Sequence, residues 1–69
     1  MVKEIKYRHV KRFLIDSGWH VLRTSASHEI WGGPNATDRL SIPRHGDKVS
    51  PGVVRQIITA LPNSPARWR

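Results

Sequence analysis

A bounded apolar stripe in the C-terminal half of the chain constrains the fold most strongly. Ser50 is a residue type favoured at helix N-caps, and Pro51 suits the first helical position. Apolar residues then recur at helical spacing until Pro62 ends the stripe: Val53, Val54, Ile57, Ile58 and Leu61. The pattern predicts an amphipathic helix that buries one face against another layer of the protein.

A second apolar stripe lies near the N-terminus. Val10, Phe13 and Leu14 recur at i, i+3 and i+4, which predicts a helix over residues 7–17. Gly18 follows the last residue of this helix, at the position where a glycine C-cap is favoured.

Three short segments between the helices have the character of strands. Residues 19–24 are rich in β-branched and aromatic types, and the segment 32–38 is a strong turn signal. Together with the small-residue turn at 25–27, these signals predict strands at 19–24, 28–31 and 39–42.

The order α-β-β-β-α predicts an α+β fold, a two-layer sandwich with a three-stranded antiparallel sheet. Both helices are expected to cover one face of the sheet and leave the other exposed. Leu40 and Ile42 are expected to face the helices, and so is Ile30. His28 shares the strand parity of Ile30, so an edge position or a bulge is needed to bring it to solvent.

Size and composition limit the class of protein. A chain of 69 residues has room for one small core, so we assign residues 1–61 to a single domain. Residues 62–69 are expected to form a mobile basic tail, polar apart from Trp68. The absence of cysteine excludes disulfides and thiolate metal sites. No segment resembles a signal peptide or a membrane span, so we expect a cytoplasmic protein without membrane contact.

The charge of the chain points to a polyanionic partner. Twelve Lys and Arg residues against five Asp and Glu residues give a net charge of +7. This excess favours RNA, DNA or an acidic protein, and it argues against a small cationic substrate. We expect neither a small-molecule substrate nor a cofactor.

Residues 18–28 carry the strongest functional signal. They form a glycine break, a strand and a small-residue turn that presents His28 near Arg23. Histidine can accept and donate a proton at cellular pH because its unperturbed pKa lies near neutrality. In a basic chain this arrangement suggests chemistry on a nucleic acid. A histidine at the start of a strand can equally be structural, and the spacing alone leaves both interpretations open.

Several short blocks resemble the HicA family of bacterial toxins, small RNA-cleaving proteins that are paired with a HicB antitoxin. The blocks are GW at 18–19, VLRT at 21–24, SH at 27–28, IPRH at 42–45 and VSPGVVRQII at 49–58. The resemblance covers roughly residues 6–61. The chain departs from the family pattern at Ala26, where the family usually has glycine, and at Glu29, where a second histidine often follows the first.

The resemblance implies a fold similar to that of double-stranded-RNA-binding domains and an endoribonuclease (mRNA interferase) activity against mRNA. It also implies that a HicB-like antitoxin neutralises the toxin. Of the residues in this chain, His28 matches the catalytic histidine of the family. We expect the cleavage to need no metal, because RNA carries its own nucleophile, the 2′-hydroxyl.

Other basic or anion-binding positions are candidates for RNA binding. Arg23 is expected across the turn from His28, where it could hold a phosphate, and His45 could be a second acid or base. The alternatives are a solvated strand arginine and an ordinary loop histidine. The complete set of candidates is Arg23, Lys11, Arg12, Arg44, His45 and Gly52, the last at the N-terminus of the second helix. The histidines show no metal-ligand spacing, so no metal site is expected.

Two further functions remain open at this point. The chain could be a non-catalytic RNA-binding module of the same fold. It could also be a degenerate toxin that still binds the antitoxin but is inactive because Ala26 replaces the family glycine.

Overall fold

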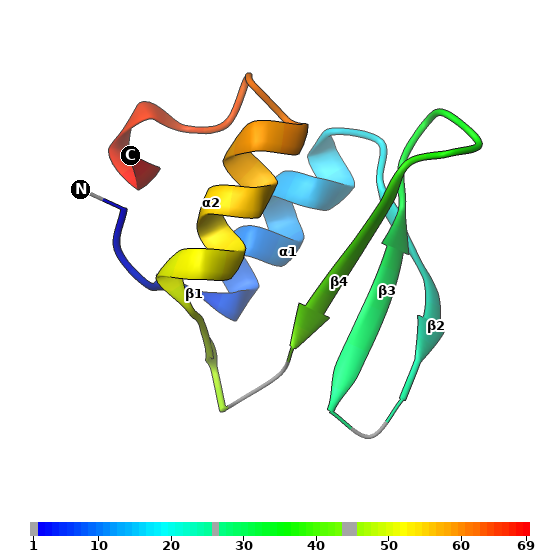
Figure 1. Ribbon diagram of the computed structural model, residues 1–69, viewed down its shortest axis with the longest axis horizontal. Coiled ribbons are helices and arrows are strands. Elements are labelled where there is room, and N and C mark those ends of the chain that lie inside the picture. The colour runs from blue at the N-terminus through cyan, green and yellow to red at the C-terminus, as the bar shows by residue number, and fades with distance from the viewer. Residues whose placement is uncertain (1, 26, 44–45) are drawn as a thin grey trace.

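Two helices pack against one face of a three-stranded sheet in the computed structural model, which describes residues 2–25, 27–43 and 46–69 (Figure 1). The helices are α1 (Tyr7–Asp16) and α2 (Pro51–Ala60). The strands of the sheet are β2 (His20–Thr24), β3 (His28–Gly32) and β4 (Arg39–Pro43). The expected α+β fold is confirmed, and it is compatible with a fold like that of double-stranded-RNA-binding domains. Within the described residues, no helix has the length and apolar character needed to cross a membrane.

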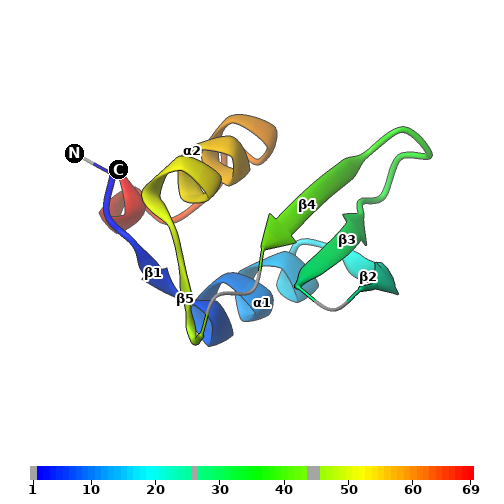
Figure 2. The ribbon, with the colours of Figure 1, turned by 60° about the horizontal axis from the view of Figure 1, so that its bottom comes forward.

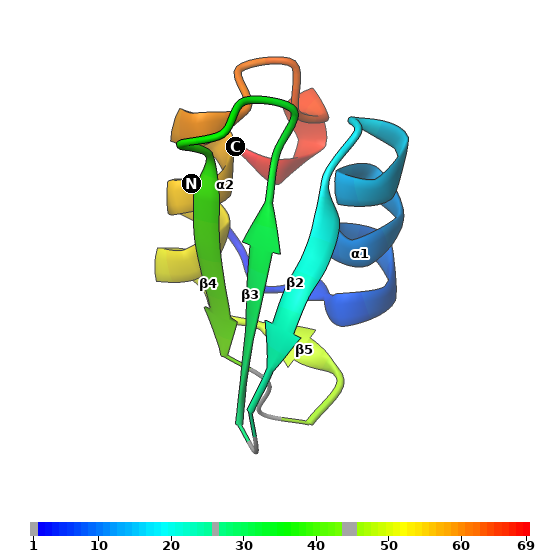
Figure 3. The same ribbon diagram turned by 90° about the vertical axis from the view of Figure 1, so that its right-hand side faces the viewer.

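The sheet is antiparallel, with the strand order β2-β3-β4. Figure 3 looks onto its uncovered face, with α1 and α2 behind it. The face toward the helices carries Leu40 and Ile42, as expected, and also Glu29 and Trp31.

The predicted orientation of β3 is wrong. Because Glu29 and Trp31 are buried, the alternation of the strand places Ile30 and His28 on the opposite, outer face. The sequence pattern was misleading because the strand contains a carboxylate that is buried and an isoleucine that is only half-buried. In this orientation the His28 side chain faces solvent, and β3 needs no bulge to place it there.

Two further strands of two residues each were not expected from the sequence. β1 (Ile5–Lys6) pairs with β5 (Lys48–Val49) in an antiparallel register, with Ile5 opposite Val49. Figure 2 shows this pair between the beginnings of α1 and α2. The N–H of Tyr7 donates to the carbonyl of Asp47 at 2.7 Å, so the first residue of α1 is fixed to the segment that leads into α2.

Gly18 ends α1 as expected. It has φ +88°, its N–H donates to the carbonyl of Ile15, and the N–H of Trp19 donates to the carbonyl of Leu14. These two bonds form a Schellman cap, in which a left-handed residue lets the chain satisfy the last carbonyls of the helix. The cap turns the chain directly into β2.

Replacing Gly18 by alanine is expected to lower the free energy of unfolding by about 1–2 kcal/mol, because a Cβ disfavours the left-handed conformation. The cost comes from the backbone, since the nearest atom to the new Cβ would be Pro34 Cγ at an ordinary 3.5 Å. Gly52→Ala is the matched control: no atom lies within 4 Å of its Cβ position, and its φ is not positive. Urea denaturation checks this prediction, and an equal effect of the two substitutions would contradict it.

The core lies between the two layers. It combines residues from α1, the segment between α1 and β2, the sheet, β5, α2 and the segment after α2: Val10, Leu14, Trp19, Trp31, Leu40, Ile42, Val49, Val54, Ile57, Leu61 and Trp68. Ser50 is the N-cap residue of α2 as expected, although its side chain makes no capping hydrogen bond.

The expectation of a mobile C-terminal tail is wrong. Residues Ala66–Trp68 form a short 3-10 helix, η1, and the Trp68 side chain is only 2 % exposed. Its ring packs edge-on against Phe13 of α1, with the ring centroids 5.1 Å apart. A large aromatic side chain gains more from burial than the short segment loses in conformational freedom.

Candidate active site

His28 lies at the first position of β3, where the chain returns from β2. Its carbonyl accepts hydrogen bonds from the N–H of Ser25 at 2.9 Å and from the Ser25 hydroxyl at 3.3 Å. Both bonds join the backbone of His28 to Ser25, while the His28 side chain is exposed. The imidazole is therefore carried by a fixed backbone and is open to a large substrate.

The Ser27 hydroxyl fixes one nitrogen of the imidazole. Ser27 Oγ lies 3.0 Å from His28 Nδ1. A hydroxyl can donate to an unprotonated nitrogen or accept from a protonated one, so this contact is compatible with either tautomer of the ring. Because Ser27 engages Nδ1, Nε2 is the imidazole nitrogen available to a further partner.

A β-bulge in β2 determines where Arg23 points. Val21 is opposite Trp31, but Arg23 is opposite Ile30, so the register shifts by one residue between them. Directly opposed residues share a face, and the bulge therefore turns Arg23 onto the outer face that carries His28. Arg23 and His28 are diagonal neighbours on this face, a relation that separates side chains by about 7–8 Å in an antiparallel pair.

Behind His28, the buried carboxylate of Glu29 connects β3 to α1. Glu29 is 7 % exposed, and its Oε1 accepts hydrogen bonds from the Tyr7 hydroxyl and, at 3.3 Å, from Trp31 Nε1. Tyr7 is the first residue of α1, so this cluster fixes the strand of His28 relative to that helix. No sequence motif marks Tyr7 as functional, and its contact with Glu29 joins residues 22 positions apart. The sequence feature that points to this cluster is Glu29 itself, a carboxylate at the position where the HicA family often has a second histidine.

Trp31 is 1 % exposed, with its indole N–H directed to Glu29. A base cannot stack on a side chain that is enclosed in this way. Trp31 is thus part of the core and of the cluster behind His28, and not an RNA-stacking platform.

The remaining candidates are only partly described. Arg44 and His45 lie outside the described residues. Gly52 is exposed in the first turn of α2. Next to this turn, a hollow of about 240 Å³ is lined by Pro43, Ser50, Val53, Lys48, Glu4 and Asp47. Two of these side chains are carboxylates, and Glu4 pairs with Lys48 at 3.2 Å, so the hollow does not favour an anion.

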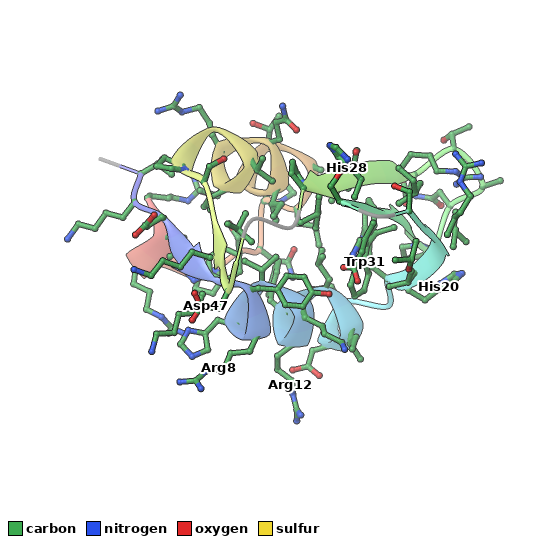
Figure 4. The ribbon with its side chains drawn as sticks, turned by 90° about the horizontal axis from the view of Figure 1, so that it is seen from below. Arg8, Arg12, His20, His28, Trp31 and Asp47 are labelled. Atoms are coloured by element: carbon green, nitrogen blue, oxygen red, sulfur yellow. The ribbon has the colours of Figure 1, made fainter. Side chains whose placement is uncertain are left out.

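Lys11 and Arg12 lie on the outer surface of α1. Arg12 Nε is 3.3 Å from Asp16 Oδ2 in an exposed pair. Figure 4 shows Arg8 and Arg12 pointing away from α1 on the side of the molecule opposite His28. The structure therefore brings Arg23 to the same face as His28, and it places Lys11 and Arg12 on a separate surface.

The residues of the described ranges include no group of three His, Asp or Glu side chains that could hold a metal ion.

Comparison with known proteins identifies one family. The sequence model that describes the HicA toxin of bacterial toxin-antitoxin systems matches residues 7–61. The matched stretch begins at the first residue of α1 and ends one residue after α2, so it includes the sheet and His28 and excludes η1. Searches of curated proteins and of solved structures gave no significant match.

Proposed function

The chain belongs to the HicA toxin family of bacterial toxin-antitoxin systems, and from this premise we propose that it is an endoribonuclease that cleaves mRNA without a metal ion. His28 is the proposed catalytic residue. The observation that carries the proposal is the exposed imidazole of His28, with Ser27 Oγ 3.0 Å from its Nδ1.

The proposed reaction uses the 2′-hydroxyl of the RNA as the nucleophile. The 2′-oxygen attacks the adjacent phosphorus while a base removes its proton. The bond from phosphorus to the 5′-oxygen then breaks, and an acid protonates the leaving oxygen. The products are a 2′,3′-cyclic phosphate and a 5′-hydroxyl, and no bond in this sequence requires a metal or an external water.

His28 has the chemistry needed for one of the two proton transfers. The contact with Ser27 suits both roles at Nε2, because Nδ1–H can donate to the Ser27 hydroxyl whether Nε2 is unprotonated, as in a base, or protonated, as in an acid. A positioned acid or base typically contributes about 10²–10⁴-fold to a rate. Arg23 is proposed to bind the phosphate whose charge grows in the transition state, since it shares the outer face with His28.

The place of His28 in the fold supports a polymeric substrate. The end of the sheet that carries the start of β3 projects beyond the helices (Figures 1 and 3). A long RNA can reach a projecting turn that would not enclose a small molecule. The net charge of +7 adds affinity for phosphates that is independent of sequence and sensitive to salt. The proposed place of action is the cytoplasm, where mRNA is translated.

The proposed partner is a HicB-like antitoxin that covers His28 and blocks its access to RNA. A polar, exposed site of this kind can be neutralised by steric exclusion alone, without any change in the toxin fold.

Incubation of the purified protein with mRNA in excess EDTA tests the proposed activity. We expect cleavage to continue at an unchanged rate, because the groups assigned to the reaction are side chains and the 2′-hydroxyl. RNA binding without cleavage, in EDTA and in magnesium alike, would instead support a non-catalytic RNA-binding module. Cleavage that EDTA abolishes would contradict the metal-free mechanism.

A further inference from the structure

The outer surface of α1 forms a basic face with an apolar side chain at one end. Arg8, Lys11, Arg12 and Ile15 are spaced at i, i+3, i+4 and i+7, so they share one side of the helix. All four are exposed, and they line a shallow hollow of about 230 Å³. We call these four residues the α1 outer face.

Ile15 is the unusual member of the α1 outer face. It is 51 % exposed, whereas Val10 and Leu14 already supply the buried face of the same helix. The fold therefore does not require an isoleucine at this position. A large apolar side chain next to three cations resembles the boundary between the apolar core of a protein interface and its polar rim.

We infer that the α1 outer face is a docking surface for a segment of the antitoxin that presents carboxylates around an apolar side chain. This inference rests on the proposed toxin function and adds a second contact region to it. Three cations on one helix face, with Asp16 as their acidic neighbour, complement an acidic partner.

The side chains of the α1 outer face favour this partner over two alternatives, a second copy of the chain and RNA. A second copy of the chain would bring the same three cations together, and like charges at an interface oppose association. RNA would engage the cations, but its phosphates gain nothing from Ile15. A protein segment with both acidic and apolar groups satisfies all four side chains.

The α1 outer face is distant from the catalytic residue. Arg8 and Arg12 lie on the side of the molecule opposite His28 (Figure 4). A contact there adds affinity to the complex without touching the reacting groups. The antitoxin can thus bind tightly through α1 while another part of it excludes RNA from His28.

The experiment uses the antitoxin itself, identified as the product of the adjacent reading frame whose co-expression restores growth. Purified antitoxin is titrated against the toxin with His28→Ala, alone and combined with Ile15→Ser or Arg8→Glu. Each second substitution is expected to raise Kd by about tenfold, because Ile15→Ser removes the apolar contact and Arg8→Glu replaces an attraction for carboxylates by a repulsion. Arg55→Glu, an equal charge reversal on the exposed side of α2, is the matched control and is expected to change Kd less than about twofold.

Each outcome leads to a decision. Unchanged affinity in both variants would overturn the docking surface while leaving the toxin function intact. Slower RNA cleavage by Arg8→Glu in the chain that retains His28, with antitoxin affinity unchanged, would assign the α1 outer face to RNA and also overturn the inference. If no adjacent reading frame restores growth, the proposed pairing with an antitoxin fails, and the docking surface fails with it.

Discussion

Replacement of His28 by alanine is expected to abolish RNA cleavage and growth inhibition while the fold stays intact. The imidazole is exposed and contributes nothing to the core, and the bonds to the His28 carbonyl involve backbone that alanine retains. Loss of an acid or base lowers a rate by about 10²–10⁴-fold, and a toxin slowed by this factor should no longer arrest growth. Gel-based cleavage rates and colony counts after induction measure the two effects.

His20→Ala is the matched control for this prediction. His20 is an exposed histidine at the start of β2, opposite Gly32 and at the other end of the sheet from His28. Its replacement is expected to leave cleavage and toxicity unchanged. Full toxicity of His28→Ala, with a circular dichroism spectrum like that of the wild type, would contradict the assigned role of His28.

Replacement of Trp68 by alanine is expected to have the largest effect on stability of any substitution considered. Trp68 is 2 % exposed and packs against Phe13, so its removal leaves a large void beside α1. Truncation of a buried aromatic side chain costs about 3–5 kcal/mol. A domain of this size has a total stability of only about 3–5 kcal/mol from its core, so the variant should be largely unfolded at 25 °C.

Urea denaturation followed by circular dichroism measures this loss. Arg67→Ala, an exposed neighbour in η1, is expected to change the stability by less than about 0.5 kcal/mol. Trp68→Phe keeps an aromatic ring in the same space and is expected to remain folded with an intermediate loss. A stability of Trp68→Ala within about 1 kcal/mol of the wild type would contradict the place of Trp68 in the core.

Elements defined by local patterns could be predicted from the sequence. The stripes of apolar residues gave both helices, and Gly18 gave the end of α1 because a left-handed cap strongly favours glycine. The turn signal at 32–38 gave the hairpin between β3 and β4. In each case the decisive interaction lies within a few residues along the chain.

Features that depend on distant contacts could not be predicted in this way. The inward orientation of Glu29 depends on Tyr7, which lies 22 positions away and donates to its carboxylate. Without knowledge of that partner, the apolar Ile30 is the residue expected to face the helices, and this expectation gave β3 the wrong orientation. Likewise, Trp68 becomes a core residue only because Phe13 of α1 lies next to it.

The same distinction between local patterns and distant contacts applies to the candidate site. The turn that presents His28 is local, so its residues could be identified from the sequence and from the family resemblance. The position of Arg23 depends on a bulge in the pairing of β2 with β3. No residue type in β2 predicts this bulge. The separation of Lys11 and Arg12 from His28 follows from the packing of α1 against the sheet, which charge alone cannot reveal.

The most direct test of the central claim, that His28 cleaves RNA through the 2′-hydroxyl, is the chemical analysis of the RNA ends produced in EDTA. Mass spectrometry of the fragments distinguishes the possible ends. The wild-type protein is predicted to leave a 2′,3′-cyclic phosphate, or the phosphate formed when it opens, next to a 5′-hydroxyl, and His28→Ala is predicted to leave the RNA intact. Fragments with a 3′-hydroxyl and a 5′-phosphate would contradict this account.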